Sequence, residues 1–103
     1  RKYRNVYDKE DVIPSIKIDD MKDVPDHISI DVEGAELLVL KGAEKTLKEH
    51  HPNIWVSVHP DMLISLYDQT KEDVLFFMDS CGYDAELLAI DHEEHWIFTP
   101  KAP

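Results

Sequence analysis

The 103-residue sequence is poor in glycine and cysteine. Its three glycines, Gly34, Gly42 and Gly82, are too far apart to form a G-x-G, so the sequence has no glycine-rich loop for a phosphate or a dinucleotide. Cys81 is the single cysteine, which excludes a disulfide framework and a cysteine-rich zinc site. A lone thiol suits a reducing compartment, and we therefore expect a cytoplasmic protein.

Positive charge and long apolar runs are scarce as well. Eleven Lys and Arg stand against 22 Asp and Glu, which gives a net charge of −11 with neutral histidines. Because affinity for nucleic acids comes mainly from basic side chains on phosphates, this composition argues against nucleic-acid binding. No apolar run is long enough for a membrane span, and none follows the basic residues at the amino end as a signal peptide requires.

Hydrophobic residues make up 43% of the chain, which is typical of a globular protein with one small core. The length allows one domain. We expect residues 1–15 to form an irregular or peripheral segment and residues 16–103 to carry the fold. The first residue is Arg1 and not Met, and we expect the chain to be part of a longer protein.

The hydrophobic pattern predicts strands and helices in alternation. Alternating or β-branched runs predict strands at residues 15–19, 28–32, 53–59, 86–90 and 95–99. Apolar residues at helical spacing predict helices at 35–50 and 70–82. The second helix begins with Thr70-Lys71-Glu72-Asp73, which resembles a capping box. Four residues separate the last two strands, a connection short enough for an antiparallel hairpin.

This order indicates an α/β fold with a mostly parallel sheet and a terminal antiparallel hairpin. Open sheets of this kind bind ligands beyond the carboxyl ends of their parallel strands. The residues to inspect therefore follow Val32 and Val58.

Asp31, Glu33 and Glu36 lie where the strand at 28–32 meets the next helix. Asp31 and Glu33 are two positions apart, which places their side chains on the same side of a strand. Two carboxylates so close to each other could bind a substrate, act as a base or share a cation. A simpler interpretation is that the acidic residues, Glu36 included, interact favourably with the positive end of the helix dipole.

His59 ends the strand at 53–59 and is expected to face the same edge of the sheet as Asp31. It could serve as a general base, a metal ligand or a hydrogen-bonded structural residue. Together with Asp31, Glu33 and Asp61 it would form an oxygen-rich set with one imidazole. Such a set suits Mg²⁺ or Mn²⁺ better than zinc.

One stretch carries a family resemblance. Ile30-Asp31-Val32-Glu33-Gly34-Ala35-Glu36 is followed by Leu40-Lys41-Gly42-Ala43, then by Pro52 and an apolar strand that ends in His59. This pattern resembles the FkbM family of S-adenosylmethionine-dependent methyltransferases, over residues 16 to about 99. The resemblance implies a Rossmann-like class I methyltransferase fold, of which residues 16–103 would be the carboxyl-terminal half.

The resemblance also implies a function and its residues. The reaction would move a methyl group from S-adenosylmethionine to a small-molecule acceptor, usually a hydroxyl on a sugar, polyketide or similar metabolite. Asp31 would lie beside the methyl donor as a cofactor-binding and catalytic residue. Glu33 and Glu36 would shape the acceptor side, and His59 would be a base or an acceptor contact.

The sequence departs from this family where the cofactor is held. A first strand with a glycine-rich loop, and an acidic residue after the second strand for the cofactor ribose, have no counterpart here. We therefore also consider a non-catalytic α/β binding or assembly module. Such a module would expose an apolar sheet edge and would dimerise or bind another chain.

Overall fold

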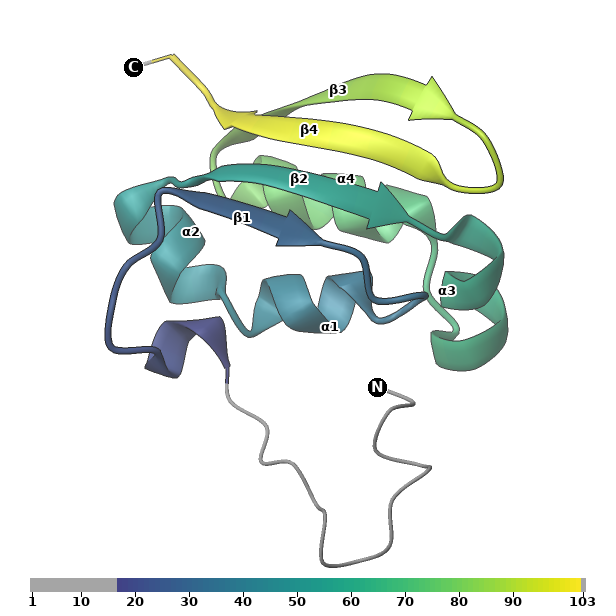
Figure 1. Cartoon of the computed structure of the whole chain (residues 1–103), viewed down its shortest axis with the longest axis horizontal. Helices are drawn as coiled ribbons and strands as arrows, with labels where there is room; N and C mark the ends of the chain where they lie inside the picture. Colours follow the sequence, from purple (N-terminus) through teal and green to yellow (C-terminus); the bar gives the residue numbers. More distant parts are fainter. Residues whose placement is uncertain (1–16, 103) are drawn as a thin grey trace, which may run out of the picture.

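Residues 17–102 are described by the computed structural model, which contains one four-stranded sheet and a set of short helices (Figure 1). The segment expected to be irregular, residues 1–15, lies outside the described residues. So do Ser15 and Ile16 of the first predicted strand. No helix among the described residues has both the length and the apolar character that a membrane crossing requires.

The sheet has the strand order β1-β2-β4-β3. Its strands are β1 (His27–Ile30), β2 (Asn53–Val58), β3 (Tyr83–Ile90) and β4 (Glu94–Pro100). Only β1 and β2 pair in parallel, while β4 pairs antiparallel with both β2 and β3. The predicted hairpin is confirmed, but the prediction of a mostly parallel sheet is wrong for the described residues. The reason is that β4 turns back from β3 and enters the sheet beside β2, so that both of its neighbours run against it.

The helices differ from the predicted ones in two places. The helix predicted at 35–50 is divided at Gly42 into α1 (Glu36–Lys41) and α2 (Glu44–His50). A helix that the pattern did not predict, α3 (Pro60–Tyr67), follows β2 directly. Pro60 ends the strand as expected, but it also begins this helix, because a proline at the first helical position needs no backbone N–H. In α4 (Lys71–Ser80) the capping box of Thr70 and Asp73 is confirmed.

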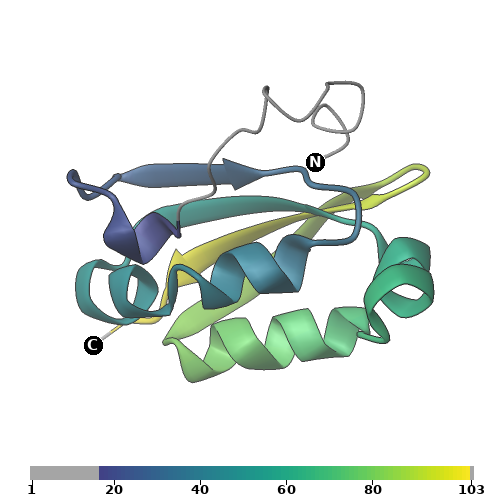
Figure 2. The same cartoon turned by 90° about the horizontal axis from the view of Figure 1, so that it is seen from below.

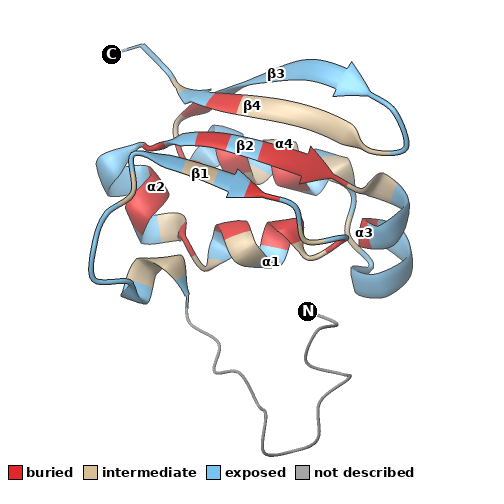
Figure 3. Cartoon of the chain, viewed as in Figure 1, coloured by how far each residue is buried: buried red, intermediate tan, exposed pale blue. Residues whose placement is uncertain are grey.

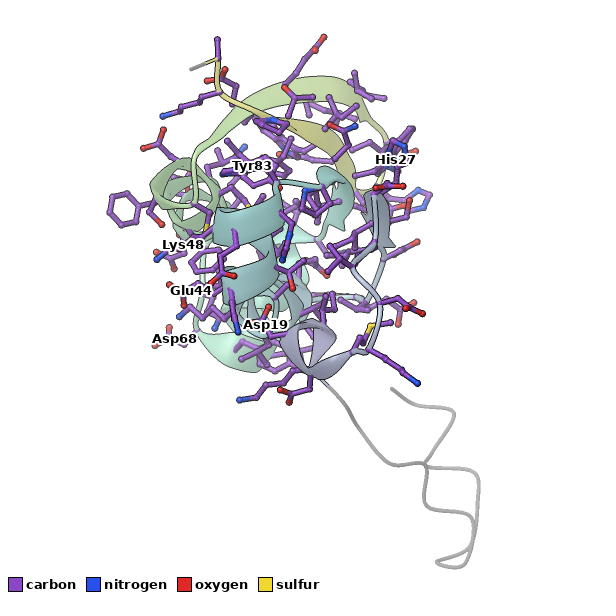
Figure 4. The ribbon with its side chains drawn as sticks, turned by 90° about the vertical axis from the view of Figure 1, so that its left-hand side faces the viewer. Asp19, His27, Glu44, Lys48, Asp68 and Tyr83 are labelled. Carbon is purple, nitrogen blue, oxygen red and sulfur yellow. The ribbon has the colours of Figure 1, made fainter. Side chains whose placement is uncertain are left out.

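The strand predicted at residues 15–19 is wrong where the structure describes it. Ile18–Asp20 form the 3-10 turn η3. The Asp19 carboxylate accepts hydrogen bonds from the backbone N–H of Lys45 at 2.9 Å and of Thr46 at 2.8 Å. Asp19 thus caps the first turn of α2 from a distant part of the chain, and Figure 4 labels it beside this helix. This tertiary cap explains why the helix restarts after Gly42.

The core lies between one face of the sheet and the helices. Figure 2 shows α1, α2 and α4 on the same side of the sheet, and the helices of the described part of the chain leave the other face uncovered. Side chains of β2 alternate accordingly, since Ile54 and Val56 are buried while Trp55 is 45% exposed. Figure 3 shows this burial in β2 and the exposed length of β3 at the far edge.

We predict that Asp19→Ala lowers the free energy of unfolding by about 1 kcal/mol, because α2 loses its acceptor for two N–H groups. Burial acts to raise the pKa of Asp19, but the hydrogen bonds from Thr46 and Lys45 outweigh it and leave the pKa lowered. The contribution is therefore complete above the ordinary carboxyl pKa of about 3.9 and is lost as the pH falls through the lowered folded value.

Urea unfolding at pH 7 and at pH 3 measures this difference. Asp20→Ala is the control, since Asp20 is exposed and its side chain accepts no hydrogen bond from residues 17–102. An equal loss of stability in both variants would contradict the capping role of Asp19.

Candidate active site

Three side chains meet where β1 and β2 end and β4 begins. Asp31 follows β1, His59 follows β2, and Glu93 precedes β4. His59 Nε2 lies 3.6 Å from Asp31 Oδ1 and 2.5 Å from Glu93 Oε2. The His59 side chain is 11% exposed and that of Asp31 is 63% exposed, so the group opens to solvent on the Asp31 side. The prediction that Asp31 and His59 lie at the same edge of the sheet is borne out by these distances.

Glu36 connects the segments that carry this group through the hydrogen bonds of its carboxylate. Its side chain is fully buried in the first turn of α1. Oε1 accepts a hydrogen bond from the backbone N–H of His59 at 3.1 Å, and Oε2 accepts one from the backbone N–H of Gly34 at 2.5 Å. Oε2 also lies 3.2 Å from His59 Nδ1. Glu36 therefore joins the turn after β1 to the end of β2 and sets the orientation of the imidazole.

Gly34 makes the reach of Glu36 geometrically feasible. It has a φ of 104°, which is unfavourable for any residue with a Cβ atom. A Cβ atom at this position would lie 2.9 Å from the Cβ of Met62 in α3. The turn is therefore held closely against α3, and the amide of Gly34 can point at the carboxylate of Glu36.

A second set of hydrogen bonds fixes the hairpin turn that carries Glu93. Asp91 Oδ1 accepts from the backbone N–H of Glu93 at 3.0 Å, and Asp91 Oδ2 lies 3.2 Å from His95 Nε2. The backbone hydrogen bond from Glu93 has the largest effect on the pKa of Asp91, and His95 has the next largest. Both contacts hold this pKa below its usual range. His95 Nδ1 in turn lies 3.2 Å from Ser57 Oγ on β2. The turn is thereby tied to the strand that ends in His59.

The remaining predicted residues lie elsewhere. Glu33 does not continue the strand, because β1 ends at Ile30; it is exposed in the following turn with a φ of 51°. Its side chain forms no hydrogen bond or ion pair within residues 17–102. Asp61 is exposed in the first turn of α3. The oxygen-rich set that Asp31, Glu33, His59 and Asp61 could have formed is thus not assembled, and nothing in this arrangement supports Mg²⁺.

Glu93 is the site residue that the sequence pattern did not identify. The turn at residues 91–95 is conspicuously rich in acidic residues and histidine. The sheet order places it at the site, since a strand antiparallel to β2 must begin where β2 ends. The charge around His59 is strongly negative, because the carboxylates of Asp31, Glu36 and Glu93 surround it. Within the described residues no Lys forms an ion pair with Asp31, Glu36 or Glu93.

An α/β sheet with a histidine and carboxylates beyond the ends of two parallel strands is the arrangement of a ligand-binding or catalytic edge. The comparisons with known proteins agree with this class. The sequence model of the methyltransferase FkbM domain matches residues 6–85. The chain therefore belongs to the methyltransferase FkbM domain family.

A solved structure supports the same assignment. The crystal structure of methyltransferase FkbM from Methylobacillus flagellatus KT superposes with a TM-score of 0.61 at 26% sequence identity. The match covers 79% of this chain and 21% of that chain, so the present chain spans about a fifth of its length. No match was found among curated proteins.

We predict that Gly34→Ala lowers the free energy of unfolding by about 1–3 kcal/mol, through the positive φ and the contact with Met62. Gly42→Ala is the matched control. Gly42 has a helical φ of −71°, and its nearest neighbour to an added Cβ lies at 3.4 Å. Thermal and urea unfolding of the two variants measure this difference. Equal stability of both variants would contradict the prediction, because the turn at Gly34 would then tolerate a Cβ atom.

Proposed function

We propose that this chain is the carboxyl-terminal part of an S-adenosylmethionine-dependent methyltransferase. The acceptor is a hydroxyl group of a small molecule such as a sugar or a polyketide. Membership of the methyltransferase FkbM domain family supports methyl transfer. The observation that carries the proposal is the pair of Asp31 and His59 at the ends of two parallel strands, with the imidazole oriented by the buried Glu36.

The described residues fit part of the cofactor. S-adenosylmethionine carries a positive sulfonium and supplies an electrophilic methyl group when it is bound. An edge with an exposed Asp31 and an excess of carboxylates complements positive charge. The adenosine part needs other residues, because no G-x-G occurs in this sequence. These would come from a preceding segment of a longer protein, in line with the fifth of the solved methyltransferase's length that the chain spans.

Each residue has a role that follows from its place. Asp31 is the solvent-facing carboxylate and contacts the cationic part of the cofactor. His59 is the acceptor contact, and its Nε2 is the atom that can take the hydroxyl proton. Glu36 is a positioning residue, because it is fully buried and acts through His59. Glu33 is exposed in the adjoining turn, where it can contact an acceptor.

We predict that Asp31→Asn in the complete protein weakens methyl transfer at least tenfold and leaves the melting temperature nearly unchanged. A charge-assisted contact contributes about 1.5–3 kcal/mol, which corresponds to a tenfold to hundredfold change, while an exposed carboxylate adds little to stability. Calorimetric titration with S-adenosylmethionine and a radioactive methyl-transfer assay measure the two effects. Asp61→Asn is the control for an exposed acidic residue nearby.

Two results would overturn the proposal. Parallel losses of activity and of thermal stability in Asp31→Asn would make Asp31 a structural residue. A complete protein that fails to bind S-adenosylmethionine would favour the alternative of a non-catalytic binding or assembly module. The feature that supports this alternative is the free edge of β1, which has a strand neighbour on one side only among the described residues and could pair with another chain.

A further inference from the structure

We propose that Asp31, His59 and Glu93 form a binding site for one first-row divalent metal ion, for which Mn²⁺ is the probe. One oxygen from each carboxylate and the Nε2 of His59 lie within 4.8 Å of one another. The three residues come from three separate segments, at the ends of β1 and β2 and the start of β4. The inference stands on this geometry and does not depend on methyl transfer.

The surroundings of His59 are those of a metal ligand. Glu36 is fully buried and accepts hydrogen bonds from two backbone N–H groups, which fix the position of its carboxylate. Its Oε2 lies 3.2 Å from His59 Nδ1, so this carboxylate can accept a hydrogen bond from an N–H at Nδ1. An ion bound at Nε2, between Asp31 and Glu93, would take the place of a proton on that nitrogen. A histidine that ligates a metal characteristically donates its second ring N–H to a carboxylate in this way.

Charge points in the same direction. Three carboxylates, those of Asp31, Glu36 and Glu93, surround one imidazole. Lys71 is engaged with Glu94, and within residues 17–102 the other basic group near the site is His95, whose Nε2 lies 3.7 Å from Glu93 Oε1. Even a doubly protonated His59 leaves an excess of negative charge comparable to one divalent ion. Such an excess at a partly desolvated position is stabilised most directly by a cation.

The ligand set selects among metals. Mg²⁺ and Ca²⁺ prefer oxygen ligands alone, whereas this set includes an imidazole nitrogen. It has no thiolate, which a Cu(I) site would favour. Ligand atoms about 2.1 Å from an ion and at right angles to each other are about 3.0 Å apart. The observed separations of 2.5 and 3.6 Å lie on either side of this value. Modest rotations of Glu93 and the exposed Asp31 would therefore complete the site.

A bound ion would also define the role of His59. With an ion on Nε2, that nitrogen would not be available as a base, so this inference replaces the proton-accepting role of His59 in the proposed function, and an acceptor hydroxyl would be held by the ion. A hydroxyl group bound to a divalent ion loses its proton more readily than a free one. The hairpin turn thereby becomes part of the site, because it supplies Glu93.

The test is a titration of the 103-residue chain with Mn²⁺, followed by electron paramagnetic resonance. The six-line signal of free aqueous Mn²⁺ decreases as the ion binds. We expect saturation at one ion per chain. Asp31→Asn and His59→Gln should each weaken binding at least tenfold, and Glu36→Gln should weaken it about 10–100-fold through the orientation of His59. Circular dichroism reports whether each variant is folded, and Asp31→Asn tests the site even if His59→Gln does not fold.

His92→Gln is the matched control. His92 belongs to a second, exposed group with Asp91 and Glu93, so it shares Glu93 with the proposed site but not His59. We expect this variant to bind Mn²⁺ as the parent chain does. Loss of binding in His92→Gln with retention in His59→Gln would place the ion on the hairpin turn and overturn the proposal. So would binding that does not saturate at one ion, or that is unchanged in Asp31→Asn.

Discussion

The buried carboxylate of Glu36 is the contact on which the arrangement of the site depends. Within residues 17–102 it is the one side chain that hydrogen-bonds to the turn after β1 and to the backbone at the end of β2 and also lies against the imidazole of His59. A fully buried carboxylate is costly unless its oxygens are satisfied, and here backbone N–H groups from two segments satisfy them. The same interactions that make Glu36 tolerable in the core therefore lock His59 into a single orientation.

This constraint extends outward through the sheet. Gly34 lies tightly against α3, which begins immediately after His59, so the helix and the turn support each other. On the other side, the hairpin is joined to β2 through His95 and Ser57. Asp31, by contrast, is exposed. The site thus combines an imidazole held in position with a carboxylate that can move, which is a suitable combination for binding a ligand from solution.

The sequence predicted the parts of the fold that local chemistry determines. The capping box at Thr70, the stop of β2 before Pro60 and the short hairpin depend on neighbouring residues and were visible in the pattern. Long-range contacts were not. The side chain of Asp19 caps a helix about 26 residues away, and β4 lies between β2 and β3 although it comes last. For the same reason Asp31, Glu36 and His59 could be identified as candidates, whereas Glu93 could not.

The central position of β4 also governs the order in which the molecule can be completed. During synthesis β1, β2 and the helices emerge first, and β2 keeps an unpaired edge until the last described strand arrives. Closing that edge joins residues that are far apart in the chain, as in the pairing of Ile54 with Phe98. Such closures are slow steps in folding, and the edge is prone to wrong pairing until then. Pairing of β4 with β2 therefore completes the sheet, and Glu93 reaches the site only after this pairing.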